Sequence, residues 1–196
     1  MSPEDEARWR GARTLADLGE LVAQWLEGTI KSVPTVVPGY GPDEDTTLLV
    51  PVLAAANRAG FVTDFSQPGE DVDGRVQRAA VAGFASPATF ARLCAVAAEA
   101  DLMITAARAG DIYWGTCVTV SVDNDRENTW AGGAQTRSAI WDGYGWCCHP
   151  SAVEALCRAW QVTLIDPQWG RNDHLWPVLQ SFAAKAMTDG IQGAST

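Results

Sequence analysis

Apolar residues recur at helical spacing in the first third of the chain. Ser2 and Pro3 predict the start of a first helix, with three acidic residues in its first turn. A second helix is expected to begin near Thr14, where Asp17 completes a partial capping box. Its apolar face consists of Leu15, Leu18, Val22, Trp25 and Leu26. Prolines and glycines then crowd residues 31–42, which predicts a connector and a domain boundary.

After residue 43 the pattern alternates between helices and strands. A helix is predicted over residues 45–59, opened by Asp45, Thr46 and Thr47. Strands are expected over residues 61–65, 76–84, 102–107, 115–122 and 162–165, with a polar loop over residues 67–74. Further helices are expected over residues 86–97, 150–160 and 175–187, whereas residues 123–145 follow no clear pattern. The alternation predicts a single α/β (α+β) domain in which helices flank a central mixed sheet.

The length of 196 residues fits one domain of ordinary size. We expect an N-terminal helical extension with its connector over residues 1–42, an α/β domain over residues 43–188 and a flexible tail over residues 189–196. Hydrophobic residues make up 47% of the chain, which is enough for a buried core and excludes global disorder.

Charge and apolar patterning narrow the classes of partner. The formal net charge of −10 argues against a nucleic-acid binder, because the excess of Lys and Arg that would neutralise phosphates is missing. A cationic ligand, a basic protein partner, DNA mimicry and a homodimer remain open. No apolar run approaches the ~20 residues that span a bilayer, and the acidic first residues do not resemble a secretory signal. We therefore expect a cytoplasmic protein without membrane association, and the five cysteines to be reduced thiols.

Two local clusters of side chains could take part in metal binding or catalysis, and each also has a purely structural interpretation. Cys147-Cys148-His149 could hold zinc or form a Cys/His nucleophile pair, but no second cluster with ligand spacing accompanies it. We therefore favour a helix start with buried thiols, and we predict no metal site. Asp166, Asp173 and His174 could perform acid–base chemistry, yet aspartates at these element ends more often cap and turn. Phosphate-binding glycine loops and nucleophile elbows are absent.

The segment from Asn57 to Pro68, Asn-Arg-Ala-Gly-Phe-Val-Thr-Asp-Phe-Ser-Gln-Pro, carries a family likeness. It resembles part of the C-terminal regulatory domain of eukaryotic methylenetetrahydrofolate reductase, where an acidic residue and a threonine open the preceding helix. Residues 76–79, 114–115, 162–166 and 172–176 continue the likeness in the same order, so that it spans about residues 43–187. The chain also resembles an uncharacterised actinobacterial domain family, which implies no function.

The resemblance implies binding of S-adenosylmethionine or S-adenosylhomocysteine. The flavin-containing barrel of the reductases has no counterpart here, so folate reduction, FAD and NADPH are not carried over. The departure at Tyr113, where the family has a threonine, bears on which ligand is bound. The resemblance places the ligand-binding residues at Asp45, Thr46, Thr63, Ser66, Gln67, Tyr113 and Trp114.

Residue chemistry supports the same pocket independently. A carboxylate and a hydroxyl at a helix start lie beside free backbone N–H groups, and Thr63 and Ser66 end the strand that follows. Such groups suit a ribose or an amino-acid head, although they could equally serve only as a helix cap and a turn. The favoured function is a free-standing ligand-binding or sensor module. The alternatives are an acidic interaction module and a small enzyme whose catalytic group would come from Asp64, Asp166, Asp173, His149 or His174.

Overall fold

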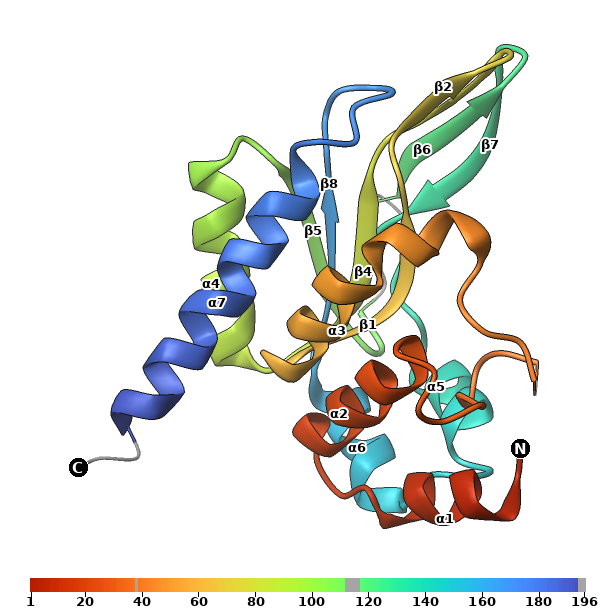
Figure 1. Ribbon diagram of the computed structural model, residues 1–196, viewed down its shortest axis with the longest axis vertical. Helices are drawn as coiled ribbons and strands as arrows, with labels where there is room; N and C mark the ends of the chain where they lie inside the picture. The colour runs from red at the N-terminus through yellow and green to blue at the C-terminus, as the bar shows by residue number, and fades with distance from the viewer. Residues whose placement is uncertain (38, 112–116, 194–196) are drawn as a thin grey trace.

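The chain folds as one α+β domain, which confirms the fold class that the sequence predicts. The computed structural model describes residues 1–37, 39–111 and 117–193 (Figure 1). The helices are α1 (Pro3–Gly11), α2 (Leu15–Leu26), the 3-10 helix η1 (Glu44–Leu49), α3 (Val50–Arg58), α4 (Pro87–Glu99), α5 (Arg137–Tyr144), α6 (Pro150–Arg158) and α7 (Leu175–Gly193). The strands are β1 (Phe61–Gln67), β2 (Glu70–Val72), β3 (Arg75–Gln77), β4 (Ala80–Ala85), β5 (Met103–Arg108), β6 (Val118–Asp123), β7 (Arg126–Ala131) and β8 (Trp160–Ile165).

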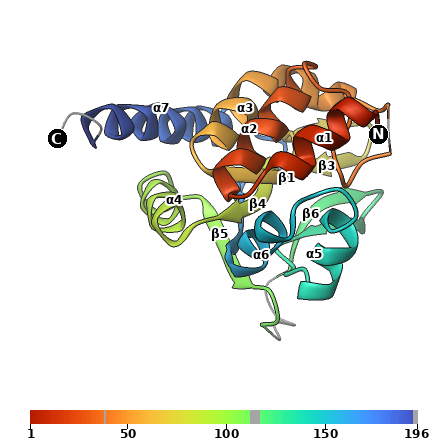
Figure 2. The same ribbon diagram turned by 90° about the horizontal axis from the view of Figure 1, so that it is seen from below.

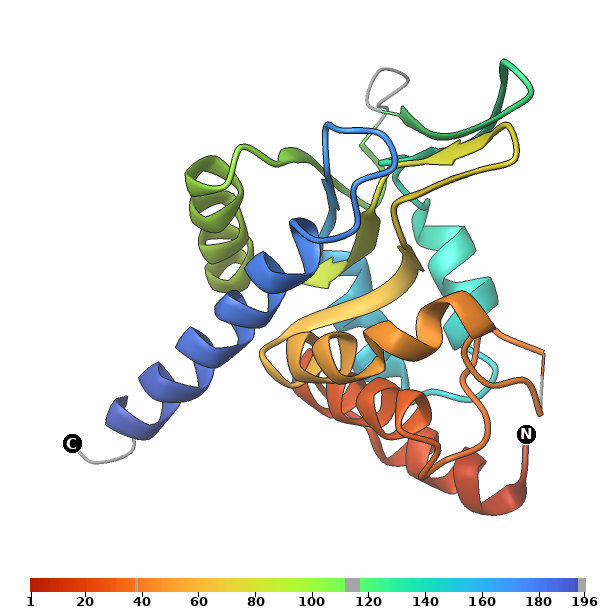
Figure 3. The same ribbon diagram turned by 45° about the horizontal axis from the view of Figure 1, so that its top comes forward.

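The strands form two antiparallel sheets, where we expected one mixed sheet. The first sheet has the order β1-β4-β8-β5 and the second β2-β3-β6-β7. The outgoing arm of one long hairpin supplies β1 and β2, and the returning arm supplies β3 and β4, so the hairpin bends from one sheet into the other (Figures 1 and 3). Pro68 and Gly69 interrupt the outgoing arm, and Asp73 and Gly74 make the turn with φ angles of 49° and 83°. Half of the residues in the predicted polar loop, Gln67 and those of β2, are therefore strand.

The N-terminal helices belong to the main core rather than to an extension of it. The Ser2 hydroxyl accepts a hydrogen bond from the Asp5 N–H at 3.1 Å, and Thr14 and Asp17 form the predicted capping box. Trp9 is fully buried, and its indole N–H donates to the Ser32 carbonyl at 2.9 Å. Helices α2 and α3 pack against β1 of the first sheet, and α6 contacts both α2 and α5 (Figure 2). The core thus includes side chains of α1, of α2 and of the segment that follows them up to Val33.

Some helices and strands begin or end at other residues than predicted, because a proline or packing against a distant segment determines their bounds. The helix expected over residues 45–59 begins as η1 and becomes α-helical at Val50, since Pro51 fits only a first helical turn. Asp43 occupies the cap position of η1, but its side chain makes no capping bond. Strand β7 and helix α5 occupy the segment without a clear pattern, and α7 continues to Gly193 through most of the expected tail. Within the described residues, no helix has the length and apolar character needed to cross a bilayer.

Candidate functional site

A β-bulge at Asp64 shapes the candidate site. Thr63 pairs with Gly83 and Phe65 with Ala82, so Asp64 is the extra residue in the β1–β4 ladder. A Cβ atom at position 83 would lie 2.3 Å from the Val62 carbonyl oxygen and 2.7 Å from the Thr63 Cα. Only glycine allows the two strands to approach so closely beside the bulge. The bulge turns β1 locally and brings Asp64 and Phe65 to the walls of two cavities.

The first of these, the helix-side cavity, has a volume of about 270 Å³. It lies between α2, the 33–46 segment, β1 and α5. It is lined by Val22, Trp25, Leu26, Val33, Thr35, Val36, Gly41, Pro42, Asp43, Thr46, Leu53, Thr63, Asp64, Phe65, Ser66 and Tyr144. Three of the predicted ligand-binding residues, Thr46, Thr63 and Ser66, therefore face one cavity.

The other predicted site residues lie elsewhere. Asp45 is exposed and does not line the helix-side cavity, whereas Asp43 does. The Gln67 amide donates to the backbone carbonyls of Arg78 at 3.0 Å and Val120 at 2.9 Å, so it joins the two sheets instead of facing a ligand. Tyr113 and Trp114 are outside the described residues.

Thr63 has a structural partner as well as a place in the cavity wall. Its hydroxyl oxygen accepts from the buried Asn57 amide at 2.7 Å, and its N–H donates to the Asn57 side-chain oxygen at 3.0 Å. These bonds tie α3 to β1. A hydroxyl that accepts one hydrogen bond still has its proton to donate, so Thr63 can serve both roles.

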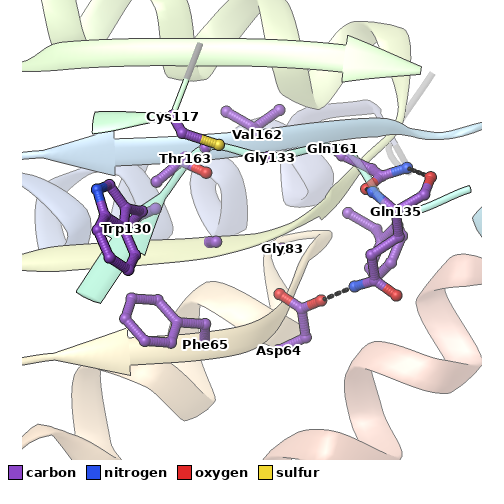
Figure 4. Close-up of a pocket in the computed structure, with 14 residues that line it drawn as sticks. Asp64, Phe65, Gly83, Cys117, Trp130, Gly133, Gln135, Gln161, Val162 and Thr163 are labelled. Atoms are coloured by element: carbon purple, nitrogen blue, oxygen red, sulfur yellow. Dashed lines mark hydrogen bonds between the residues drawn. The ribbon is translucent and has the colours of Figure 1, made fainter. Parts of the chain in front are cut away.

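The second cavity, the sheet-side cavity, has a volume of about 250 Å³ and meets the first at Asp64 and Phe65. Figure 4 shows the residues that line it. The Gln135 amide donates to the Asp64 carboxylate at 2.8 Å. The Gln161 side chain holds Gln135 in turn, accepting from its backbone N–H at 2.6 Å and donating to its carbonyl at 2.9 Å. This chain of bonds fixes the Asp64 carboxylate against β8.

Asp64 is the titratable group that the two cavities share. Burial raises the pKa of its carboxyl group from 3.8 to about 6, while the hydrogen bond from Gln135 opposes the rise. The residue as a whole remains open to solvent, so water at the cavity mouth screens part of this effect. Burial, and after it the charge of Asp64, raises the pKa of Tyr144, which lines the helix-side cavity.

Comparison with known proteins identifies the family. A model of a protein family matches residues 4–186, which is nearly the whole chain. The chain belongs to the DUF6919 family. This family is a domain of unknown function, and its match begins within α1, in agreement with the burial of Trp9. No curated protein matches this DUF6919 chain.

The sequence clusters outside the cavities have structural roles in this DUF6919 domain. Cys147 and Cys148 are buried, and the His149 ring nitrogen Nδ1 accepts from the Ser151 N–H at 3.2 Å, which caps α6. The described residues contain no group of three or more His, Cys, Asp or Glu side chains suited to hold a metal ion. These contacts support the interpretation of a helix start with buried thiols.

Asp166 also has a structural role. It is fully buried, and its two oxygens accept from Nε and Nη2 of Arg171, each at 2.7 Å. The His174 ring lies 2.7 Å from the Ala100 carbonyl oxygen. Neither Asp166, Asp173, His149 nor His174 lines the two cavities, so Asp64 is the one enzyme candidate from the sequence that does.

Several lining residues of the DUF6919 domain were not predicted. Asp43, Phe65, Trp130, Gln135 and Gln161 reach the cavities through the bulge and through contacts between distant segments. The sequence contains nine tryptophans, and their number alone does not indicate which of them lines a cavity.

The raised pKa of Asp64 predicts a pH-dependent stability difference. An aspartate with a folded-state pKa above its unfolded value stabilises the fold below the unfolded pKa, and this contribution is lost as the pH rises through the folded pKa. We expect the wild-type protein to lose stability relative to Asp64→Asn between about pH 4 and about pH 7. Asp43 faces the same cavity, but it is present in both proteins, so its contribution to the stability difference cancels. The raised pKa of Tyr144 keeps the Tyr144 hydroxyl protonated over this pH range.

Urea unfolding of both proteins across this pH range measures the difference. Parallel stability curves would show that the Asp64 carboxyl group titrates at its ordinary pKa.

Proposed function

We propose that this DUF6919 domain is a small-molecule binding module whose helix-side cavity takes a ligand of the S-adenosylmethionine or S-adenosylhomocysteine type. The observation that carries the proposal is the convergence of Thr46, Thr63 and Ser66 on one cavity. They come from η1 and from β1, which are separate segments of the chain. The carboxylates of Asp43 and Asp64 line the same cavity.

The cavity wall has the chemistry that such a ligand needs. Hydroxyl and carboxylate oxygens suit the hydroxyls of a ribose and the ammonium of an amino-acid head. Trp25 offers an aromatic surface for a purine, and its indole N–H is held by the Tyr40 carbonyl at 3.3 Å. The volume of about 270 Å³ lies near the lower end of small-molecule sites, so we expect one end of the ligand to be enclosed.

The resemblance to the reductase regulatory domain supports the ligand class. Its acidic-threonine pair and its Thr-x-x-Ser spacing are present at Asp45-Thr46 and Thr63–Ser66. Asp43, rather than Asp45, supplies the acidic group of the cavity wall.

The pair Asp43 and Asp45 provides a matched test. Neither carboxylate caps η1, so alanine at either position should leave the melting temperature of the free protein nearly unchanged. We expect Asp43→Ala to reduce the thermal stabilisation by S-adenosylhomocysteine, because a charged hydrogen bond contributes about 1.5–3 kcal/mol. Asp45→Ala should keep the full stabilisation, as measured by differential scanning fluorimetry. Equal losses in both variants would indicate a general effect of surface charge and would refute the assignment.

The second candidate function is an enzyme that uses Asp64 as its acid or base. A carboxyl pKa near 6 is suited to proton transfer close to neutral pH, and Asp64 lies where the two cavities meet. Release of product from a nucleoside-like or amino-acid-like ligand by the wild type, and its loss in Asp64→Asn, would favour this function. Binding without turnover favours the binding module.

The cytoplasm is the compartment that we propose for the protein. All five cysteines carry free thiols, and three of them are buried, which supports a reducing environment.

A further inference from the structure

The sheet-side cavity combines a carboxylate with aromatic rings and has no basic wall. Its floor consists of β4 and β8, and Trp130 of β7 closes one end beside Phe65 (Figure 4). Asp64 lies at the other end, hydrogen-bonded to Gln135. None of the described residues that line the cavity is Lys, Arg or His. The space therefore contains one negative charge that no lining residue neutralises.

Asp64 has room for a second partner. The Gln135 amide donates to one carboxylate oxygen, Oδ2, and the other donor to this group in the described part of the chain is its own backbone N–H, so no cationic side chain pairs with it there. A carboxylate at the wall of a cavity is stabilised when a positive charge with N–H donors displaces its water and pairs with it. Gln161 fixes the position of Gln135, so the Asp64 carboxylate is held in one place.

The aromatic end favours the same kind of ligand. Trp130 is 54% exposed, and its indole N–H donates to the Glu127 carboxylate at 3.1 Å, which holds the ring at the cavity mouth. The faces of tryptophan and phenylalanine attract organic cations and pack against apolar carbon. A volume of about 250 Å³ admits a small molecule only.

We propose that the sheet-side cavity binds a small organic cation, an ammonium group carried on a short aromatic or aliphatic body. The ammonium pairs with Asp64, and the body packs against Phe65 and Trp130. This site differs from the helix-side cavity in the residues that hold the ligand, although both cavities use Asp64.

Isothermal titration with benzylammonium and benzyl alcohol at pH 7.5 tests the proposal, because the two probes share a body and differ in charge. We expect benzylammonium to bind at least about tenfold more tightly, as a charged hydrogen bond implies. Asp64→Asn should remove this preference, and Trp130→Ala should weaken benzylammonium roughly threefold or more. Asp45→Asn, which changes an exposed carboxylate outside both cavities, is the matched control and should bind like the wild type.

Equal affinity for the two probes would overturn the proposal, as would unchanged binding of benzylammonium in Asp64→Asn or no binding at millimolar concentration. Thr46→Val separates this site from the function proposed above, because Thr46 lines only the helix-side cavity. We expect it to retain benzylammonium and to lose S-adenosylhomocysteine, with Trp130→Ala showing the opposite pattern. Loss of benzylammonium in Thr46→Val would also count against a separate site.

Discussion

Replacing Trp9 with alanine will lower the free energy of unfolding by about 4 kcal/mol. The side chain is fully buried against the main core, and its indole N–H donates to the Ser32 carbonyl in the connector. Alanine leaves a large cavity and an unpaired carbonyl at the same place. For a domain of this size such a loss lowers the melting temperature by roughly 10 °C.

Chemical denaturation of Trp9→Ala measures this loss, with Trp146→Ala as the control. Trp146 is 49% exposed, and its indole N–H donates to Gly143 within its own turn, so its removal should cost much less. Trp9→Phe retains the ring but not the donor, and it should have an intermediate effect. An unchanged melting temperature in Trp9→Ala would mean that α1 is an appendage, as the sequence suggested.

Alanine at Gly69 will destabilise the fold by about 3 kcal/mol. A Cβ atom there would lie 2.0 Å from the Arg171 carbonyl oxygen, and backbone on both sides leaves no side chain to move aside. The Gly69 N–H also donates to the Asn172 side-chain oxygen at 3.0 Å, which accepts from the Trp176 indole at 2.7 Å. Separation of the two segments would therefore disturb the start of α7 as well.

Gly11→Ala is the matched control for this substitution. Gly11 ends α1, and a Cβ atom there meets nothing within 4 Å, so alanine should be neutral or slightly stabilising. Thermal melts of the two variants compare the same substitution at a position with space for a Cβ atom, Gly11, and at one without such space, Gly69. Equal melting temperatures would show that the approach of Gly69 to Arg171 is not tight in solution.

The sequence predicted the features that depend on neighbouring residues. The caps at Ser2 and Thr14 and most helices and strands follow local rules, so they lie close to where we expected them. The division into two sheets was not predictable in this way, because it depends on how the interrupted hairpin pairs with β6 and β8, more than 40 residues away. The bulge at Asp64 depends on Gly83 in another strand.

The sequence predicted only some of the residues of the candidate site, because the others reach the cavities through contacts between distant segments. Thr46 and Ser66 face the helix-side cavity, but Asp43 rather than Asp45 lines its wall, although both aspartates are exposed. Other residues of the family likeness hold the fold together: Gln67 joins the sheets, and Asn172 joins Gly69 to α7. The resemblance to the reductase domain at Gln67 and Asn172 therefore supports a similar fold, whereas the resemblance at Thr46 and Ser66 supports a similar ligand.

Calorimetric titration of the whole protein with S-adenosylhomocysteine measures directly whether the helix-side cavity binds this ligand. We expect saturable one-to-one binding that weakens at least about tenfold in the double variant Thr46→Val, Ser66→Ala, because each lost hydrogen bond contributes about 1 kcal/mol. No heat of binding in the wild type, or an equal affinity in the double variant, would contradict this expectation.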